Sequence, residues 1–123
     1  MNTYSSMLKA KLHGARVTDA QLDYEGSLTI DRDLMDYVKI LPYERILVAN
    51  LENGNRFETY AIEGERGAGA ICLNGATAHL GKKGDRLTIF TFGLVPTAEA
   101  AQHRPRVLRV NAQNKPEGGL RPA

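Results

Sequence analysis

The chain has 123 residues, enough for one domain with a modest hydrophobic core but too few for two independent domains. Its 16 Lys and Arg against 14 Asp and Glu give a formal charge of +2, far from the strongly basic balance of proteins that gather nucleic acid or anionic membranes. No segment approaches transmembrane length or has the pattern of a signal peptide, so we expect a cytoplasmic protein that contacts neither membrane nor nucleic acid.

The N-terminal third favours strands followed by one short helix. Residues 1–6 are polar and are predicted to lie outside regular structure, whereas residues 7–12 mix apolar and polar positions as strands do. Residues 31–38 are predicted to form a helix, because Asp31 can cap it and its apolar positions recur at three-to-four spacing.

The middle of the chain predicts a β-hairpin. Residues 45–51 and 56–62 are strand-like, and Asn53-Gly54 between them is a pair that tolerates the positive φ angles of tight turns. The lone cysteine, Cys72, lies in an apolar run and cannot form an intramolecular disulfide, which fits a reducing compartment and a small buried side chain.

The C-terminal third adds further strands and a polar end. Residues 69–73 and 86–94 favour strands, residues 97–102 a helical turn or two, and residues 107–110 a late strand. From about residue 111 the composition predicts a flexible tail, and the basic residues after position 102 lack the interleaved aromatics of a nucleic-acid site. Many short strands with glycine-rich corners predict an all-β fold with short helices, of the small-barrel type.

Four short blocks occur in an order and spacing that resemble the bacterial aspartate 1-decarboxylases. Together they extend over about residues 7 to 95. The blocks are Lys11-Leu12-His13, Tyr24-Glu25-Gly26-Ser27, Arg56-Phe57-Glu58-Thr59-Tyr60-Ala61-Ile62 and Asn74-Gly75-Ala76. Gly-Ser alone is a common turn dipeptide, so it is the combination of blocks that makes the resemblance specific.

The resemblance implies a double-psi β-barrel that assembles as a homotetramer, with active sites at subunit contacts. Relatives are made as an inactive proenzyme that cuts itself before a serine. On this sequence the single domain 1–123 would give a β chain of residues 1–26 and an α chain of residues 27–123. Some relatives also require a helper protein for this maturation, which makes such a helper a candidate partner here.

Self-cleavage would supply the chemistry that decarboxylation needs. Loss of carbon dioxide from an amino acid leaves a carbanion, which needs an electron sink, and a pyruvoyl group built from Ser27 provides one. Ser27 would attack the carbonyl of Gly26, a residue that can adopt backbone angles closed to others. By resemblance, Thr59 would hold that carbonyl oxygen, and Tyr24 would orient the cleavage loop.

The same resemblance assigns roles in turnover of L-aspartate to β-alanine and carbon dioxide, a step that feeds pantothenate and coenzyme A biosynthesis. The substrate amine would form a Schiff base with the pyruvoyl ketone, and Tyr60 would return a proton to carbon. Arg56 would grip a carboxylate, with Lys11 and His13 near it. The pocket would be lined by Asn74, Gly75 and Ala76. We assign neither His79 nor His103 to a metal, since neither has a partner at ligand spacing.

Other interpretations of these residues stay open on the sequence. Gly26-Ser27 is also a plain turn, Tyr60 a packing aromatic, and Arg56 an exposed charge. Lys11 and His13, two apart, would also suit the polar outer face of a strand. The rival interpretation for the whole chain is a non-catalytic β-barrel binding module that stays in one piece.

Two features fit the enzyme interpretation less simply. Alternation along residues 56–62 puts Thr59 and Tyr60 on opposite faces of a strand, although the resemblance asks both to serve one site. Position 49 is alanine where some relatives carry a bulky aromatic near the pocket, which predicts a site that is either roomier or closed by other residues.

Overall fold

A computed structural model describes residues 2–118 and 121–122. In chain order the elements are β1 (Tyr4–Arg16), β2 (Asp19–Gln21), β3 (Ser27–Asp31), α1 (Arg32–Val38), β4 (Arg45–Asn50), β5 (Arg56–Gly64), β6 (Ile71–Asn74), the 3₁₀ helix η1 (Gly75–His79), β7 (Arg86–Pro96), the 3₁₀ helix η2 (Thr97–Gln102), β8 (Arg106–Arg109) and β9 (Arg121–Pro122). Strands dominate the described residues, and the helices are short, as predicted. None of the helices in these ranges has the length and apolar character that crossing a membrane requires.

The strands join in the order β2-β6-β3-β5-β4-β7-β1-β8-β9. Three neighbouring pairs, β1 with β8, β2 with β6 and β3 with β5, run parallel. Parallel neighbours need crossover connections, so the chain cannot be a simple meander. The β3–β5 crossover passes through α1 and β4, and it brings the start of β3 beside the middle of β5.

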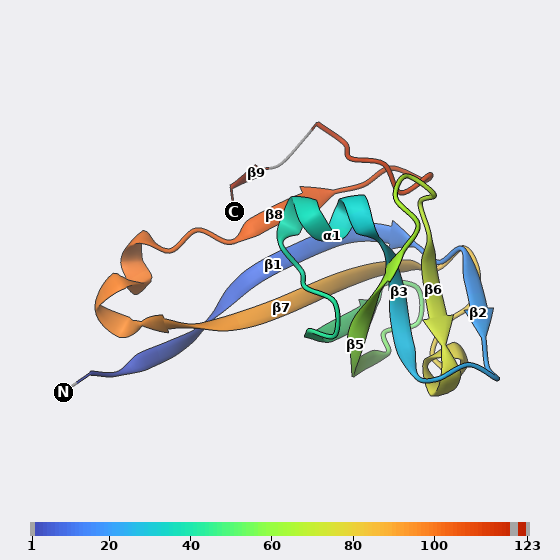
Figure 1. Cartoon of the computed structure of the whole chain (residues 1–123), viewed down its shortest axis with the longest axis horizontal. Coiled ribbons are helices and arrows are strands. Elements are labelled where there is room, and N and C mark those ends of the chain that lie inside the picture. The colour runs from blue at the N-terminus through green and yellow to red at the C-terminus, as the bar shows by residue number, and fades with distance from the viewer. Residues whose placement is uncertain (1, 119–120, 123) are drawn as a thin grey trace.

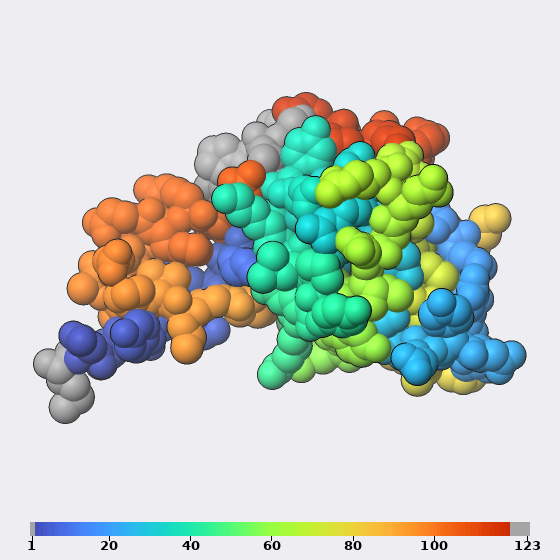
Figure 2. Space-filling view, in the orientation of Figure 1, coloured from blue at the N-terminus to red at the C-terminus, as the bar shows by residue number. Residues whose placement is uncertain are grey.

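β1 and β7 form a long antiparallel ribbon whose far end projects from the barrel (Figures 1 and 2). Its register shifts twice, between Leu8 and Ala10 and between His13 and Ala15. Such irregularities add local twist, which curves the inner half of the ribbon around the core. Residues 4–6, predicted to lie outside regular structure, instead belong to β1, because residues 94–96 of β7 pair with them.

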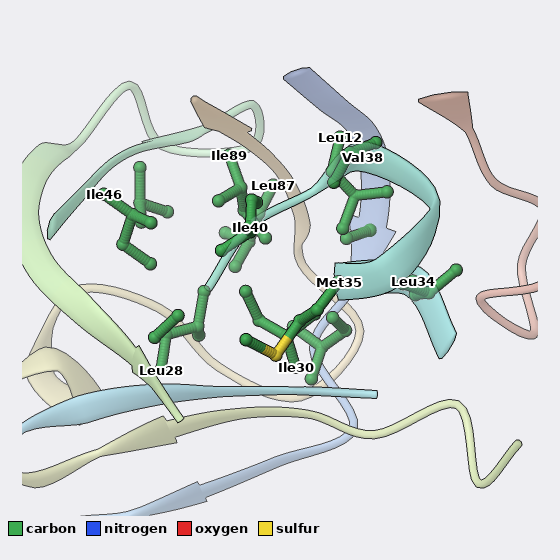
Figure 3. Close-up of a cluster of buried hydrophobic side chains, with 14 of the residues drawn as sticks. Leu12, Leu28, Ile30, Leu34, Met35, Val38, Ile40, Ile46, Leu87 and Ile89 are labelled. Carbon is green, nitrogen blue, oxygen red and sulfur yellow. The ribbon is translucent and has the colours of Figure 1, made fainter. Parts of the chain in front are cut away.

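The core lies between the curved sheet and α1. Figure 3 shows Met35 and Val38 of α1 gathered with Leu12, Ile30 and Ile40, and all five side chains are buried. The helix begins as predicted, because the Asp31 carboxylate accepts a hydrogen bond from the Asp33 N–H at 2.9 Å. The predicted hairpin is also confirmed, with β4 and β5 antiparallel and Gly54 at φ +78° in the turn.

The C-terminal segment folds back onto the barrel, although the composition predicts a flexible tail from about residue 111. Asn114 is buried at φ +59°, and its carboxamide bridges two distant loops. It accepts from the Arg16 N–H and donates to the carbonyl oxygens of Arg16 and Gly69. Residues 111–118 are therefore part of the folded domain, while positions 119–120 and 123 of the predicted tail lie outside the described residues.

Candidate active site

The Gly26–Ser27 junction marks the passage from an exposed loop into a buried strand. Tyr24, Glu25 and Gly26 are exposed, whereas Ser27 is 1% exposed and is the first residue of β3. Its hydroxyl accepts a hydrogen bond from Asn74 Nδ2 at 3.0 Å and lies 3.4 Å from the Glu25 carbonyl oxygen. The sheet therefore fixes a serine hydroxyl next to a peptide bond whose other side belongs to an exposed loop.

Gly75 supports the loop that precedes this junction. It has a φ of +64°, and a Cβ placed on it would lie 2.7 Å from Gly26 Cα, Gly26 N and the Tyr24 carbonyl oxygen. A side chain at position 75 would therefore displace residues 24–26. Gly26 itself does not have a positive φ, and a Cβ there would meet nothing within 4 Å. The expectation that Gly26 uses backbone angles closed to other residues is thus wrong, and the glycine that geometry requires is Gly75.

Thr59 and Tyr60 come beside the junction through the parallel pairing of β3 and β5. The printed register begins where Leu28 pairs with Ala61. Continued one residue back along both chains it brings Ser27 level with Tyr60, and continued two residues back it brings Gly26, just before β3, level with Thr59. Both side chains are half-buried, and they point to opposite faces because they are adjacent in a strand. The Tyr60 ring also packs against Tyr43, with ring centroids 6.4 Å apart.

A second group of candidate residues surrounds the Phe90 ring. Lys11 Nζ lies 5.9 Å from the centroid of this ring, and the Arg56 guanidinium carbon lies 5.6 Å from it. No carboxylate of the described residues forms an ion pair with Lys11 or Arg56. Two cations held near one aromatic ring thus stay available to an anionic ligand.

His13 extends this second group along β1. Its Nδ1 lies 3.3 Å from the Thr88 hydroxyl. Burial lowers the pKa of His13, and the nearby charges of Arg109, Lys11 and Arg86 lower it further. The imidazole is therefore largely neutral at neutral pH, and it can accept or donate a hydrogen bond without adding to the local positive charge.

Within one chain the two groups remain apart. Arg56 and Tyr60 share a face of β5 but are four residues apart, which corresponds to about 13 Å along a strand. The junction group comprises Tyr24, Gly26, Ser27, Thr59, Tyr60, Asn74, Gly75 and the exposed Ala76. The cationic group comprises Lys11, His13 and Arg56.

Comparison with known proteins identifies the family. The family described as aspartate decarboxylase matches residues 3–117. An aspartate 1-decarboxylase of Thermoanaerobacter pseudethanolicus is 51% identical over 110 residues, covering 89% of this chain and 94% of that protein. One of Syntrophobacter fumaroxidans is 54% identical over 110 residues, covering 89% of each chain.

The chain belongs to the aspartate decarboxylase family.

Membership confirms the predicted fold, since this family has the double-psi β-barrel architecture, and it does not favour the non-catalytic alternative. Enzymes of the family depend on a covalent pyruvoyl group. The junction fits the formation of such a group, because a buried serine hydroxyl is held beside an exposed peptide bond and Gly75 leaves room for the loop that carries this bond.

Three side chains near the junction escaped the sequence reasoning. Thr77 donates to the Asn74 carbonyl oxygen at 2.7 Å and lies 3.4 Å from that of Ser27. Thr29 and Cys72 both contact the Asn74 carboxamide, so Cys72 is half-buried and polar in its contacts, rather than a buried apolar side chain. A threonine three residues after Asn74 is a local signal for Thr77, whereas Thr29 and Cys72 become neighbours only through strand pairing.

Proposed function

We propose that this protein is the precursor of an aspartate 1-decarboxylase, which cuts itself between Gly26 and Ser27 and then converts L-aspartate to β-alanine and carbon dioxide. The observation that carries the proposal is the fixed position of the Ser27 hydroxyl. It is buried at the start of β3, bonded to Asn74, and joined to a loop that Gly75 accommodates. The product feeds pantothenate and coenzyme A biosynthesis, and we place the enzyme in the cytoplasm.

Self-cleavage begins with attack of Ser27 Oγ on the carbonyl carbon of Gly26. A C–O bond forms and the C–N bond breaks, so the amide becomes an ester and the nitrogen of residue 27 becomes a free amine. Loss of the Cα proton with departure of the ester oxygen leaves Gly26 as a carboxylate and residue 27 as a dehydroalanine. Water then replaces the nitrogen, releases ammonia and leaves a pyruvoyl group.

Thr59 stabilises the first of these steps. The carbonyl oxygen of Gly26 gains negative charge during attack, and a hydroxyl placed to donate to it lowers the barrier. The support for this role is the pairing of Leu28 with Ala61, because continuing it two residues back along both chains brings Thr59 level with Gly26. Tyr24 restrains the loop that leads to Gly26, and its support is the Tyr24 carbonyl oxygen, which lies so close to Gly75 that a Cβ there would be 2.7 Å away.

Substrate binding is assigned to the cationic group. A guanidinium can hold a carboxylate through two parallel hydrogen bonds, which suits Arg56 to one carboxylate of aspartate. Lys11 contributes a second positive charge over the same ring, and His13 a neutral hydrogen-bonding group. Ala49 pairs with Arg56 in the sheet, so a short side chain lies beside this arginine.

When formed, the pyruvoyl group supplies the carbonyl that accepts the electrons of the departing carboxylate. Tyr60 moves the proton to the substrate carbon, because a phenol can both donate and accept. Its support is the register that places it level with Ser27. Asn74 and the backbone of Gly75 and Ala76 line the pocket around the substrate.

The complete site forms between subunits of a homotetramer. Arg56 lies too far along β5 to serve the junction of its own chain, so a neighbouring protomer supplies it. The projecting β1–β7 ribbon offers the apolar surface that assembly needs, with Tyr4 59%, Phe92 51% and Leu94 74% exposed. Maturation is either spontaneous or assisted by a helper protein, as in some relatives.

The Ser27→Ala variant tests the proposal. Without the hydroxyl neither the ester nor the pyruvoyl group can form, so we expect no cleavage and no β-alanine from L-aspartate. Ser5→Ala is the control, because it changes a half-buried serine of β1 whose hydroxyl contacts Thr97 rather than a residue of the junction, and it should leave both properties unchanged. Decarboxylation by Ser27→Ala at the parent rate would refute the assigned chemistry.

A further inference from the structure

The Asn74 carboxamide is held on three sides by strand side chains. One Nδ2 hydrogen goes to Ser27 Oγ at 3.0 Å, and the other goes to Thr29 Oγ1 at 2.9 Å. Its Oδ1 accepts from the Cys72 thiol at 3.1 Å. Thr29 and Cys72, which have no role in the proposed function, therefore orient the carboxamide that contacts Ser27.

The sheet builds this arrangement directly. In the antiparallel pair of β3 and β6, Ser27 faces Asn74 and Thr29 faces Cys72. Residues two apart on a strand share a face, so all four side chains lie on the same side of the pair. Their contacts follow from the register.

Packing holds the Thr29 side chain in place, and the protonation state of Cys72 keeps its thiol a hydrogen-bond donor. The Thr29 methyl group lies 3.0 Å from the point where a Cβ on Gly64 would be, so it fills the space that this glycine leaves. A β-branched side chain confined in this way has little rotamer freedom. Burial raises the pKa of the Cys72 thiol, with a smaller effect from Asp19, so at neutral pH the thiol keeps the proton that it donates.

We propose that Thr29 and Cys72 are positioning residues for self-cleavage, which orient the Asn74 carboxamide so that its N–H meets Ser27 Oγ. The inference rests on the proposed function, because it assigns the nucleophile to Ser27. A serine hydroxyl has one hydrogen and two lone pairs. The Asn74 N–H engages one lone pair and thereby fixes the direction of the other, which attacks Gly26.

Removing the Thr29 acceptor would leave a buried N–H of Asn74 without a partner. The carboxamide would then turn toward other acceptors, and its second N–H would move away from Ser27. The expected consequence is slower cleavage of a chain that still folds.

The test follows the rate of cleavage of freshly purified precursor by intact mass. Thr29→Val keeps the shape and removes the hydroxyl, and we expect it to slow cleavage roughly five- to tenfold. Thr29→Ser restores the hydroxyl and should return the rate to within about twofold of the parent, a difference of well under 1 kcal/mol in barrier. Thr91→Val is the matched control, because Thr91 is a buried strand threonine of β7 whose hydroxyl has no partner among the described residues.

A parallel pair of variants tests the other contact. Cys72→Ala should slow cleavage and Cys72→Ser should preserve it, since serine keeps a donor at the same position. If Thr29→Val fails to fold, the cleavage rates of Cys72→Ala and Cys72→Ser test the positioning role in its place.

The outcomes separate this inference from the proposed function. Cleavage of Thr29→Val at the parent rate, or equal slowing in Thr29→Val and Thr29→Ser, would overturn the positioning role alone. A parent protein that makes β-alanine while its chain stays uncut would overturn the proposed function and this inference with it.

Discussion

At the scale of single residues, the proposed self-cleavage depends on close contacts among a few small groups. The Ser27 hydroxyl, the Asn74 carboxamide and the space left by Gly75 meet at the junction. Sequence resemblance names these residues, but it does not reveal why Gly75 must be glycine. That reason comes from its positive φ and from the backbone of Gly26 beside it.

Gly75→Ala should therefore impair maturation. Its Cβ would lie 2.7 Å from Gly26 atoms, so the loop must shift and the attacking geometry is lost. We expect cleavage to slow by roughly tenfold or more, the effect of about 1.4 kcal/mol on a barrier. Gly54→Ala is the control, because Gly54 has a similar φ of +78° and open space around its Cα. Equal cleavage rates in the two variants would show that the close contact at Gly75 is unimportant.

At the scale of elements, the features set by neighbouring residues could be predicted from the sequence, whereas those set by distant residues could not. The α1 helix and the β4–β5 hairpin could be predicted because a capping aspartate, apolar spacing and an Asn-Gly pair lie within a few residues of each other. The start of β1 at Tyr4 and the contact between Ser27 and Asn74, 47 residues apart, could not, since both depend on strand partners distant in sequence.

The C-terminal segment is likewise held by contacts between residues distant in sequence. Asn114 looks like part of a loose tail, yet it joins the end of β1 to the loop before β6 through three hydrogen bonds. Asn114→Ala removes the partner of one buried and two partly buried backbone groups, which should lower the free energy of unfolding by roughly 2–4 kcal/mol. Denaturant unfolding measures this loss. Gln113→Ala changes an exposed neighbour and should alter the free energy of unfolding by less than about 0.5 kcal/mol. Equal losses in Asn114→Ala and Gln113→Ala would show that the Asn114 hydrogen bonds do not stabilise the fold.

At the scale of the whole molecule, the separation of the junction group from the cationic group is the main consequence of the fold. A site shared between protomers predicts complementation. Arg56→Ala should be cut normally but use aspartate poorly, and Ser27→Ala should be uncut and inactive. Mixed tetramers, refolded or co-expressed from the two variants, should regain part of the parent activity, because some interfaces then pair an intact junction with an intact Arg56. Mixed tetramers no more active than Arg56→Ala alone would place the complete site within one chain.

The central claim is that this polypeptide makes its own electrophile at position 27, and intact mass analysis of mature, active protein tests it most directly. The account predicts two chains, residues 1–26 and 27–123, with the larger one carrying a pyruvoyl group in place of an N-terminal serine and resisting N-terminal sequencing. Active protein that consists of one uncut chain, or of a larger fragment with an ordinary serine amine, would contradict it.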